Sequence, residues 1–551
     1  MFAKTKTEEP RAISAHGAAD ALFNLARKWI EECDKYHPDC IGDVDDKDTL
    51  PVLPSRVIDV GVGQEDKIKL YISRGERARY LTLSHCWGRR DHKCKLSHVD
   101  LENWCKEIPQ EIIPQTFLDA IQVTRRLGHR YLWIDSVCII QPTEEDSSDW
   151  QVEGSRMADI YRNTYCNILA AAAIDSVSGF LIPRQGIKYP LRDCAIPTNS
   201  TSEPYIFFRP RSPGTQGNIY GRGWVYQEQI LPARSLHWSA HSLYWQCVTK
   251  SAPEMKSNLR TEVQRLKIMK WDVPTMGSII RNTPLFKDKQ KSMTENELRQ
   301  RMVVEWTSFV KEYTKRKLSV DTDRLVAIAG LASSVAMRAQ FAHVRYFAGL
   351  WDCMLAELLC WSSDMLSTNT PRRPNGYVAP SWSWASVIGR IVWAHMFDMK
   401  FMFSILGVEM KPISDPYGLL EAHGGRLMLK GKLRGDFCGE VELPLCDCCK
   451  TEGARDSHEF GPQYCKVIPP EPSTSDISEL MWDVFPVRPE ESFYCFLFGE
   501  RNGSGKYEQY ALALKRVPLM EDTYQRVGWV RLGYMFSEHF SECEESVITI
   551  V

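Results

Sequence analysis

RYLTLSHCWG (residues 79–88) and YLWIDSVCIIQ (residues 131–141) are the two stretches that decide the fold. Each is a short apolar run without polar alternation, which is typical of a strand buried on both faces of a parallel sheet. Each run ends in polar residues, Ser84 and His85 in the first and Asp135 and Ser136 in the second. In such sheets, ligands bind outside the carboxyl ends of the strands. We therefore expect both pairs of residues to lie in one site.

The composition is that of a soluble globular protein with more than one domain. The chain has 551 residues, of which 44% are hydrophobic and 25% charged, and such a length predicts about three or four domains. The net charge is −2, whereas proteins that bind nucleic acid or anionic membranes are typically basic. No stretch approaches the ~18 uncharged apolar residues of a membrane span. We expect neither a nucleic-acid partner nor a membrane partner.

The N-terminal residues and the cysteines bear on the cellular compartment. MFAKTKTEEP (residues 1–10) has no apolar core, so we expect no secretory signal. The 18 cysteines are scattered, and several, such as Cys138 and Cys166, lie within apolar runs. Cysteines in this setting are typical of reduced, core-filling thiols. We expect a cytoplasmic protein, with the nucleus as the alternative.

The pattern of apolar residues divides the chain into four parts. Residues 1–78 hold a helix (17–35) and a hairpin-like lead-in with strands at 56–60 and 67–71. Residues 79–250 contain the predicted core, with strands at 79–84, 130–135 and 166–172, helices at 113–127, 148–164 and from 221, and a hairpin of 235–238 with 243–247. Residues 251–400 are mainly helical, and residues 401–551 have the short alternating strands of an all-β module. The alternation of strands and helices predicts an α/β fold with a parallel sheet, and SDWQ (148–151) has the form of a capping box.

Five blocks of sequence in the predicted core resemble the HET (heterokaryon incompatibility) domain of filamentous fungi. They follow one another in the family's order over roughly residues 79–230: LTLSHCWG (81–88), WIDSVCIIQ (133–141), Trp150 and Glu153 before MADIY (157–161), AAA (170–172) with Asp175 and Gly179, and RGWVYQE (222–228). The resemblance implies a role in fungal non-self recognition and in regulated cell death after unlike cells fuse. HET domains are in turn remotely similar to TIR domains, which implies a TIR-like, Rossmann-type core.

Glu153 is the candidate catalytic residue. Some TIR domains cleave NAD at the bond between nicotinamide and ribose with a glutamate carried on a helix, so the resemblance implies NAD as a possible substrate and no firm cofactor. Glu153 lies one helical turn before Met157, toward the apolar face, where a carboxylate is costly unless it has a partner or a function. The alternative is an ordinary acid in the first turns of a helix, paired with Arg156 or with a distant arginine.

The candidate binding residues stand mainly at the ends of the predicted strands. They are Ser84, His85, Trp87, Asp135, Ser136 and Arg222. Ser84 and His85 are not a catalytic dyad, because neighbours on a strand point to opposite faces. Arg222 is the best candidate to bind an anionic group of a ligand. For Glu228 we expect an ion pair with either Arg222 or Arg234. The structural alternatives are core packing for Trp87 and capping of the next loop for Asp135.

Cys33, His37 and Cys40 offer three zinc-type ligands within eight residues. A structural zinc site needs four ligands, and no second pair of ligands stands at a suitable spacing. Buried thiols and polar contacts at a helix end are the favoured interpretation, and we predict no metal residue. A second, looser set comprises Cys446, Cys448, Cys449, His458 and Cys465.

Two hypotheses for the function follow. In the first, the protein is an NAD hydrolase whose depletion of NAD kills the cell. In the second, the HET domain is a non-enzymatic module that triggers death by assembling with a protein partner or with itself. The aromatic-rich later segments and the β-rich module would then form the recognition surface. Replacing Glu153 by Gln separates the two hypotheses, because it removes the charge at nearly constant volume.

Overall fold

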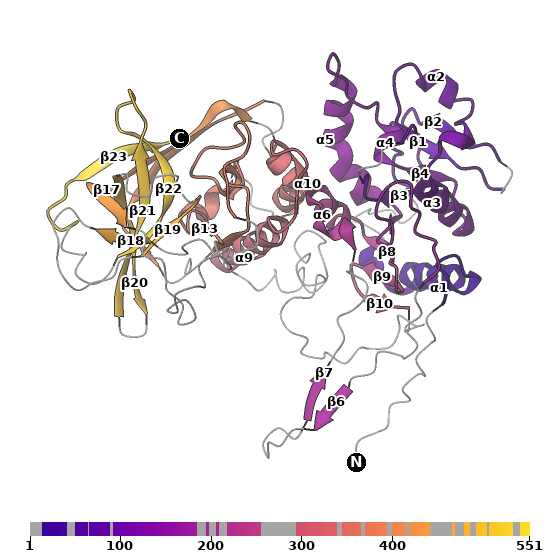
Figure 1. Ribbon diagram of the computed structural model, residues 1–551, viewed down its shortest axis with the longest axis horizontal. Helices are drawn as coiled ribbons and strands as arrows, with labels where there is room; N and C mark the ends of the chain where they lie inside the picture. The colour runs from indigo at the N-terminus through magenta and orange to yellow at the C-terminus, as the bar shows by residue number, and fades with distance from the viewer. Residues whose placement is uncertain are drawn as a thin grey trace, which may run out of the picture. The chain divides into compact units, whose positions relative to one another are not determined.

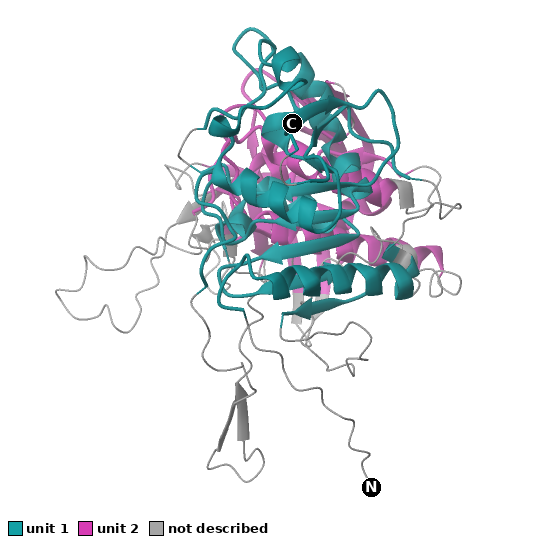
Figure 2. Ribbon diagram, turned by 90° about the vertical axis from the view of Figure 1, so that its right-hand side faces the viewer, with its two compact units in different colours: residues 1–292 teal, residues 293–551 magenta. Residues whose placement is uncertain are grey.

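The chain folds into two compact units, residues 1–292 and residues 293–551 (Figure 2). The structure is a computed structural model. It describes residues 14–40, 50–63, 66–88, 92–184, 194–197, 205–208, 217–254, 294–338, 344–364, 370–393, 399–413, 417–418, 420–440, 465–468, 479–484, 492–503, 506–532 and 540–551. Of the looser set of possible metal ligands, Cys446, Cys448, Cys449 and His458 lie outside these ranges. Among the helices so described, none has both the length and the apolar character needed to cross a bilayer.

The first unit is built on an eight-stranded mixed sheet (Figure 1). The strand order is β10 (Ser251–Pro253), β9 (Leu243–Cys247), β8 (Arg234–Trp238), β5 (Cys166–Leu169), β3 (Tyr80–Ser84), β4 (Tyr131–Trp133), β1 (Arg56–Asp59) and β2 (Lys69–Ile72). The four central strands β8, β5, β3 and β4 are parallel, whereas pairing at both margins is antiparallel. Every residue of β3 and β5 is buried. The predicted α/β fold with a parallel centre is confirmed.

The helices of this unit are α1 (Asp20–Tyr36), α2 (Leu101–Trp104), α3 (Gln115–Arg126), α4 (Asp135–Cys138), α5 (Ser148–Asn163) and α6 (Gly223–Ile230). Four of them, α1, α3, α5 and α6, lie close to the predicted positions, whereas the short helices α2 and α4 were not predicted. Pro114 precedes α3, and Gly128 follows it with φ +81°, as expected of a helix that starts at proline and stops at glycine. The predicted capping box at Ser148 is wrong, since the N-cap of α5 is Ser147 and its side chain makes no capping hydrogen bond.

The order of the central strands creates a point where the connections diverge. From β3 the chain passes through α3 to β4 on one side, and from β4 it passes through α5 to β5 on the other side of β3. From β5 it continues to α6 and β8, away from β3. The carboxyl ends of β3 and β5 therefore flank a topological switch point, which is where open α/β sheets hold their ligands. The residues that follow these two strands are therefore the first candidates for a ligand site.

The second unit combines helices with an antiparallel sheet. Its long helices are α9 (Glu295–Tyr313) and α10 (Asp323–Arg338), and α9 starts with a capping box between Thr294 and Glu297. The nine-stranded sheet comprises β15 (Lys400–Phe401), β16 (Ser404–Pro412), β17 (Leu420–Glu440), β18 (Cys465–Ile468), β19 (Glu479–Trp482), β20 (Phe493–Gly503), β21 (Lys506–Arg516), β22 (Thr523–Leu532) and β23 (Glu545–Ile550). The predicted β-rich C-terminal segment is confirmed.

Short elements complete both units. In the first, β6 (Cys194–Pro197) pairs with β7 (Tyr205–Phe208). In the second, β11 (Tyr346–Phe347) pairs with β12 (Leu350–Trp351), and β13 (Trp361–Ser363) pairs with β14 (Ile391–Trp393). Tryptophans fill the core beside these ribbons, and the carbonyl of Gly349 accepts hydrogen bonds from the indoles of Trp306 and Trp384 at 2.8 and 2.9 Å. This one carbonyl therefore pairs the indole N–H groups of two buried tryptophans.

Candidate functional site

Asn167 joins the elements that meet at the switch point. It lies in the middle of β5 and is fully buried. Its Nδ2 donates to Ser84 Oγ at 3.0 Å and to the carbonyl of Glu228 at 2.9 Å, while its Oδ1 accepts from Thr82 Oγ1 at 2.9 Å. The end of β3, the centre of β5 and helix α6 are thus tied together by one amide. Asn167 was not among the predicted site residues, although an amide inside the apolar run of a buried strand is a signal that could have indicated it.

The buried Glu228, the half-buried Asp135 and the half-buried Arg222 lie next to these strand ends. Burial raises the pKa of Glu228 to about 7, even though the charge of Arg222 and a hydrogen bond from Ser84 act to lower it. Burial also raises the pKa of Asp135, again against the charge of Arg222. Asp135 accepts hydrogen bonds from Trp87 Nε1 at 3.1 Å and from the backbone N–H of Ser136 at 2.7 Å. The guanidinium of Arg222 donates to the carbonyl of His85.

His85 is held as a neutral imidazole. Burial, together with the nearby charge of Arg222, lowers the pKa of His85 well below its ordinary value. Its ring packs edge-on against Phe117, with centroids 5.0 Å apart. Neither His85 Nε2 nor Ser136 Oγ has a hydrogen-bond partner among the described residues. These two side chains therefore keep unused hydrogen-bonding capacity at the end of the parallel strands.

The six predicted binding residues therefore lie in one neighbourhood, as the sequence led us to expect for the strand ends. Ser84, Trp87, Asp135 and Arg222 are engaged with one another, with Asn167 or with backbone groups. We call Ser84, Asp135, Asn167, Arg222 and Glu228 the strand-end cluster. A ligand that binds the charged side chains of the strand-end cluster would have to displace several of these intramolecular hydrogen bonds.

Glu153 lies in the wall of a separate pocket. The pocket has a volume of about 480 Å³. Its wall is formed by residues of α5, by residues 52–55 before β1, by the end of β2 with the turn that follows it, and by Tyr80 at the start of β3. The wall comprises Val52, Leu53, Pro54, Ser55, Ile72, Ser73, Arg74, Gly75, Tyr80, Glu153, Arg156, Asp159, Ile160 and Asn163. None of the six predicted binding residues belongs to this described wall. The candidate acid and the candidate binding residues thus occupy two places in the first unit.

Two neighbours orient the carboxylate of Glu153. Its Oε1 accepts from Ser55 Oγ at 2.8 Å and from Arg156 Nη1 at 3.3 Å. The side chain of Glu153 is 7% exposed, whereas that of Arg156 is 58% exposed. Arg74 is also exposed and adopts φ +49° in the turn that leads from β2 toward β3. This left-handed conformation is uncommon for a residue other than glycine.

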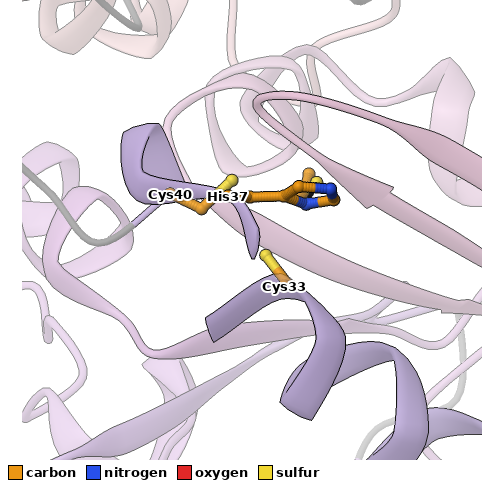
Figure 3. Close-up of side chains that lie close together, drawn as sticks. Cys33, His37 and Cys40 are labelled. Atoms are coloured by element: carbon orange, nitrogen blue, oxygen red, sulfur yellow. Dashed lines mark hydrogen bonds between the residues drawn. The ribbon is translucent and has the colours of Figure 1, made fainter. Parts of the chain in front are cut away.

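A fourth residue, Cys247, lies next to Cys33, His37 and Cys40 in the structure. Cys33, His37 and Cys40 point toward one another at the end of α1 (Figure 3). Cys247, the last residue of β9, joins them, and the ligand atoms of all four residues lie within 4.8 Å of one another. Cys247 was missed because it stands alone in the sequence, far from the other three.

Comparison with known proteins identifies the segment that contains the strand-end cluster. A family model described as heterokaryon incompatibility protein (HET) matches residues 80–228. No curated protein and no solved structure matches the chain. The matched segment includes β3, β4 and β5, as well as Glu153 and every residue of the strand-end cluster. The chain therefore contains a heterokaryon incompatibility (HET) domain at residues 80–228.

Proposed function

We propose that this protein triggers cell death in fungal non-self recognition, and that its HET domain does so by hydrolysing NAD at the bond between nicotinamide and ribose. The observation that carries the proposal is the position of Glu153. Its carboxylate is part of the wall of a pocket of about 480 Å³, which is within the usual range of roughly 300–1,000 Å³ for small-molecule sites. The remote resemblance of HET domains to TIR domains supports the same reaction by analogy of fold.

A carboxylate next to the ribose would favour this reaction, because it can stabilise positive charge on the sugar. As the bond between C1′ of the ribose and the ring nitrogen breaks, nicotinamide leaves with the electron pair and positive charge develops on the sugar. Glu153, oriented by Ser55 and Arg156, accepts hydrogen bonds from the ribose hydroxyls and stabilises this charge. Water then adds to C1′ and loses a proton, so the products are nicotinamide, ADP-ribose and one proton.

The charges around the pocket match the two ends of the substrate. Arg74 and Arg156 are exposed residues of the wall, and guanidinium groups are well suited to bind the oxygens of a pyrophosphate. The nicotinamide ring of NAD carries a positive charge, for which Glu153 and Asp159 supply opposite charge on the same wall. The pocket therefore offers both signs of charge that a dinucleotide with a cationic base requires.

Release of nicotinamide by the purified full-length protein tests the proposal. We expect wild-type protein to convert NAD to nicotinamide and ADP-ribose, and Glu153→Gln to slow this reaction by at least about 100-fold. Glu111→Gln is the matched control, because Glu111 is an exposed acid of the same unit outside the pocket. It should react like the wild type. Thermal unfolding of all three proteins should show that each is folded.

Two outcomes would contradict the proposal in different ways. If Glu228→Gln abolishes the reaction while Glu153→Gln leaves it intact, the chemistry belongs to the strand-end cluster. If wild-type protein is toxic on expression but consumes no NAD, death follows from assembly with a protein partner or with a second copy of the chain. The HET domain would then act as an interaction module.

A further inference from the structure

Four potential metal ligands converge where α1 meets the margin of the central sheet. Cys33 belongs to α1, His37 directly follows α1, and Cys40 is the last residue of the short 3₁₀ helix Pro38–Cys40. Cys247 comes from the end of β9, 210 residues after His37. All four side chains are buried, and their ligand atoms lie within 4.8 Å of one another. Two distant segments thus supply one compact set of sulfur and nitrogen atoms.

The spacing of these atoms fits a tetrahedral metal ion. With Zn–S bonds of about 2.3 Å and Zn–N bonds of about 2.0 Å, neighbouring ligand atoms of a tetrahedral zinc site lie roughly 3.5–3.8 Å apart. Cys247 Sγ and His37 Nδ1 are 3.5 Å apart. The other ligand atoms are close enough for small rotations about the side-chain bonds to complete the tetrahedron. Three cysteines and one histidine are a common ligand set for structural zinc.

Hydrogen-bond donors surround the sulfur atoms. Arg234 Nε donates to Cys33 Sγ at 3.3 Å, and the backbone N–H of Lys250 donates to Cys247 Sγ at 3.3 Å. Thr249 Oγ1 lies 3.6 Å from Cys40 Sγ. Donors directed at sulfur favour the thiolate form that binds zinc, and such outer contacts orient the ligands of metal sites. Each of the three cysteines therefore has a hydrogen-bonding neighbour suited to a thiolate.

A buried arginine offsets part of the charge of the site. Three thiolates and one Zn²⁺ together carry a net charge of −1, which is costly in a buried site unless a cation is near. The guanidinium of Arg234 is buried next to Cys33 and also forms an ion pair with Asp34, Nη2 to Oδ1 2.6 Å. Arg234 thus places a positive charge beside the thiolate of Cys33.

We propose that Cys33, His37, Cys40 and Cys247 bind a structural zinc ion that fastens α1 to β9. Four protein ligands leave no open position for a substrate, which distinguishes a structural site from a catalytic one. The same joint contains aromatic contacts, with the rings of Trp29 and Trp245 6.3 Å apart. The ion would close a loop of about 210 residues, and cross-links over long loops restrict the unfolded chain most.

Metal analysis of the purified full-length protein tests this proposal directly. We expect about one zinc ion per chain in the wild type and less than a tenth of that in Cys247→Ser and His37→Gln. His37→Cys should keep the zinc, because it retains four ligands. Cys94→Ser is the matched control, since Cys94 is a buried cysteine of the same unit outside the cluster, and it should also keep the zinc.

A measurement on the wild type alone guards against variants that fail to fold. Removing the ion with a chelator should lower Tm by at least about 5 °C, and Zn²⁺ but not Mg²⁺ should restore it. Replacement by Co²⁺ should produce the absorption bands of tetrahedral cobalt bound to thiolate. The proposal is wrong if wild-type protein made in zinc-supplemented medium carries no zinc and a chelator leaves Tm unchanged. It is equally wrong if two of the three cysteines are found as a disulfide in that protein.

Discussion

The guanidinium of Arg184 and the carboxylate of Glu254 form an ion pair, Nη1 to Oε2 2.7 Å, in which the two side chains are 1% and 0% exposed. Glu254 also accepts hydrogen bonds from the backbone N–H groups of Ser14 at 2.6 Å and Leu243 at 2.7 Å. One carboxylate therefore connects the start of the described chain, the segment before β6 and strand β9. Its neutralisation would leave a buried arginine without its counter-charge.

We expect Glu254→Gln to destabilise the protein by about 3–5 kcal/mol, because breaking a buried ion pair leaves one uncompensated charge in the interior. Glu102→Gln is the control. Glu102 pairs with Lys106 on the surface at 3.2 Å, and loss of such an exposed pair should change the free energy of unfolding by less than about 1 kcal/mol. Urea denaturation of both variants checks the difference. Equal effects would show that the Arg184–Glu254 pair contributes no more than a surface pair.

Glu228 should make stability depend on pH. Its pKa is about 7 in the fold against an ordinary value of 4.5, so the folded state binds the proton more tightly than the unfolded state. The resulting stabilisation is complete below about pH 4.5 and is lost as the pH rises through about 7, at a total of on the order of 3 kcal/mol. Glu228→Gln mimics the protonated form and should lack this loss.

Urea denaturation at several pH values tests this expectation. The free energy of unfolding of Glu228→Gln should exceed that of the wild type increasingly from about pH 4.5 to pH 7.5. Glu111→Gln, an exposed acid, should give a curve that runs parallel to that of the wild type. Parallel curves for Glu228→Gln as well would mean that this carboxyl group is ionised in the fold at neutral pH.

Gly88 should tolerate alanine far less well than Gly128. Both glycines have positive φ, +75° and +81°, a conformation that costs an L-residue about 1–2 kcal/mol. A Cβ atom on Gly88 would also lie 2.2 Å from Cβ of Asp175, whereas one on Gly128 would meet nothing within 4 Å. We expect Gly128→Ala to cost about 1 kcal/mol and Gly88→Ala at least about 3 kcal/mol. Thermal unfolding should rank the two, and a reversed order would contradict this account.

Replacing Asn167 should destabilise the protein even when the new residue is aspartate, which has nearly the same shape. Asn167→Asp replaces the Nδ2 donor to Ser84 and to the Glu228 carbonyl with a carboxylate oxygen beside a buried acid. We expect a loss of about 3 kcal/mol or more at pH 7, because acceptors then face acceptors in the interior. The exposed Asn103→Asp should change stability by less than about 0.5 kcal/mol. Similar urea midpoints for both variants would show that the Asn167 amide is dispensable.

The sequence was most informative where the local pattern of apolar residues and the packing in the fold favour the same structure. The apolar runs that contain Leu81 and Leu132 are buried strands because parallel strands in the middle of a sheet are covered on both faces. The neighbourhood of Ser84 and Asp135 could be predicted for the same reason, since parallel strands end at a common edge.

Contacts between distant segments could not be predicted in this way. The pocket beside Glu153 needs residues 52–55 and 72–75 as its second wall, and no local pattern in α5 indicates which loops will cover it. Cys247 joins Cys33 through the pairing of β9 with β8, which brings a solitary cysteine to α1. Likewise, the serine next to a helix start caps it only if the loop before it takes the right path, and Ser147 and Ser148 make no such bond.

The extent of the central sheet sets the smallest piece of this protein that can be studied alone. The matched residues 80–228 contain β3, β4 and β5, whereas their sheet neighbours β1 and β8 lie at Arg56–Asp59 and Arg234–Trp238. A fragment trimmed to the matched limits would expose an unpaired edge on β4 and another on β5, and bare edges of this kind invite aggregation. Recombinant fragments should therefore reach from before α1 to beyond Glu254, so that inactivity reflects chemistry rather than misfolding.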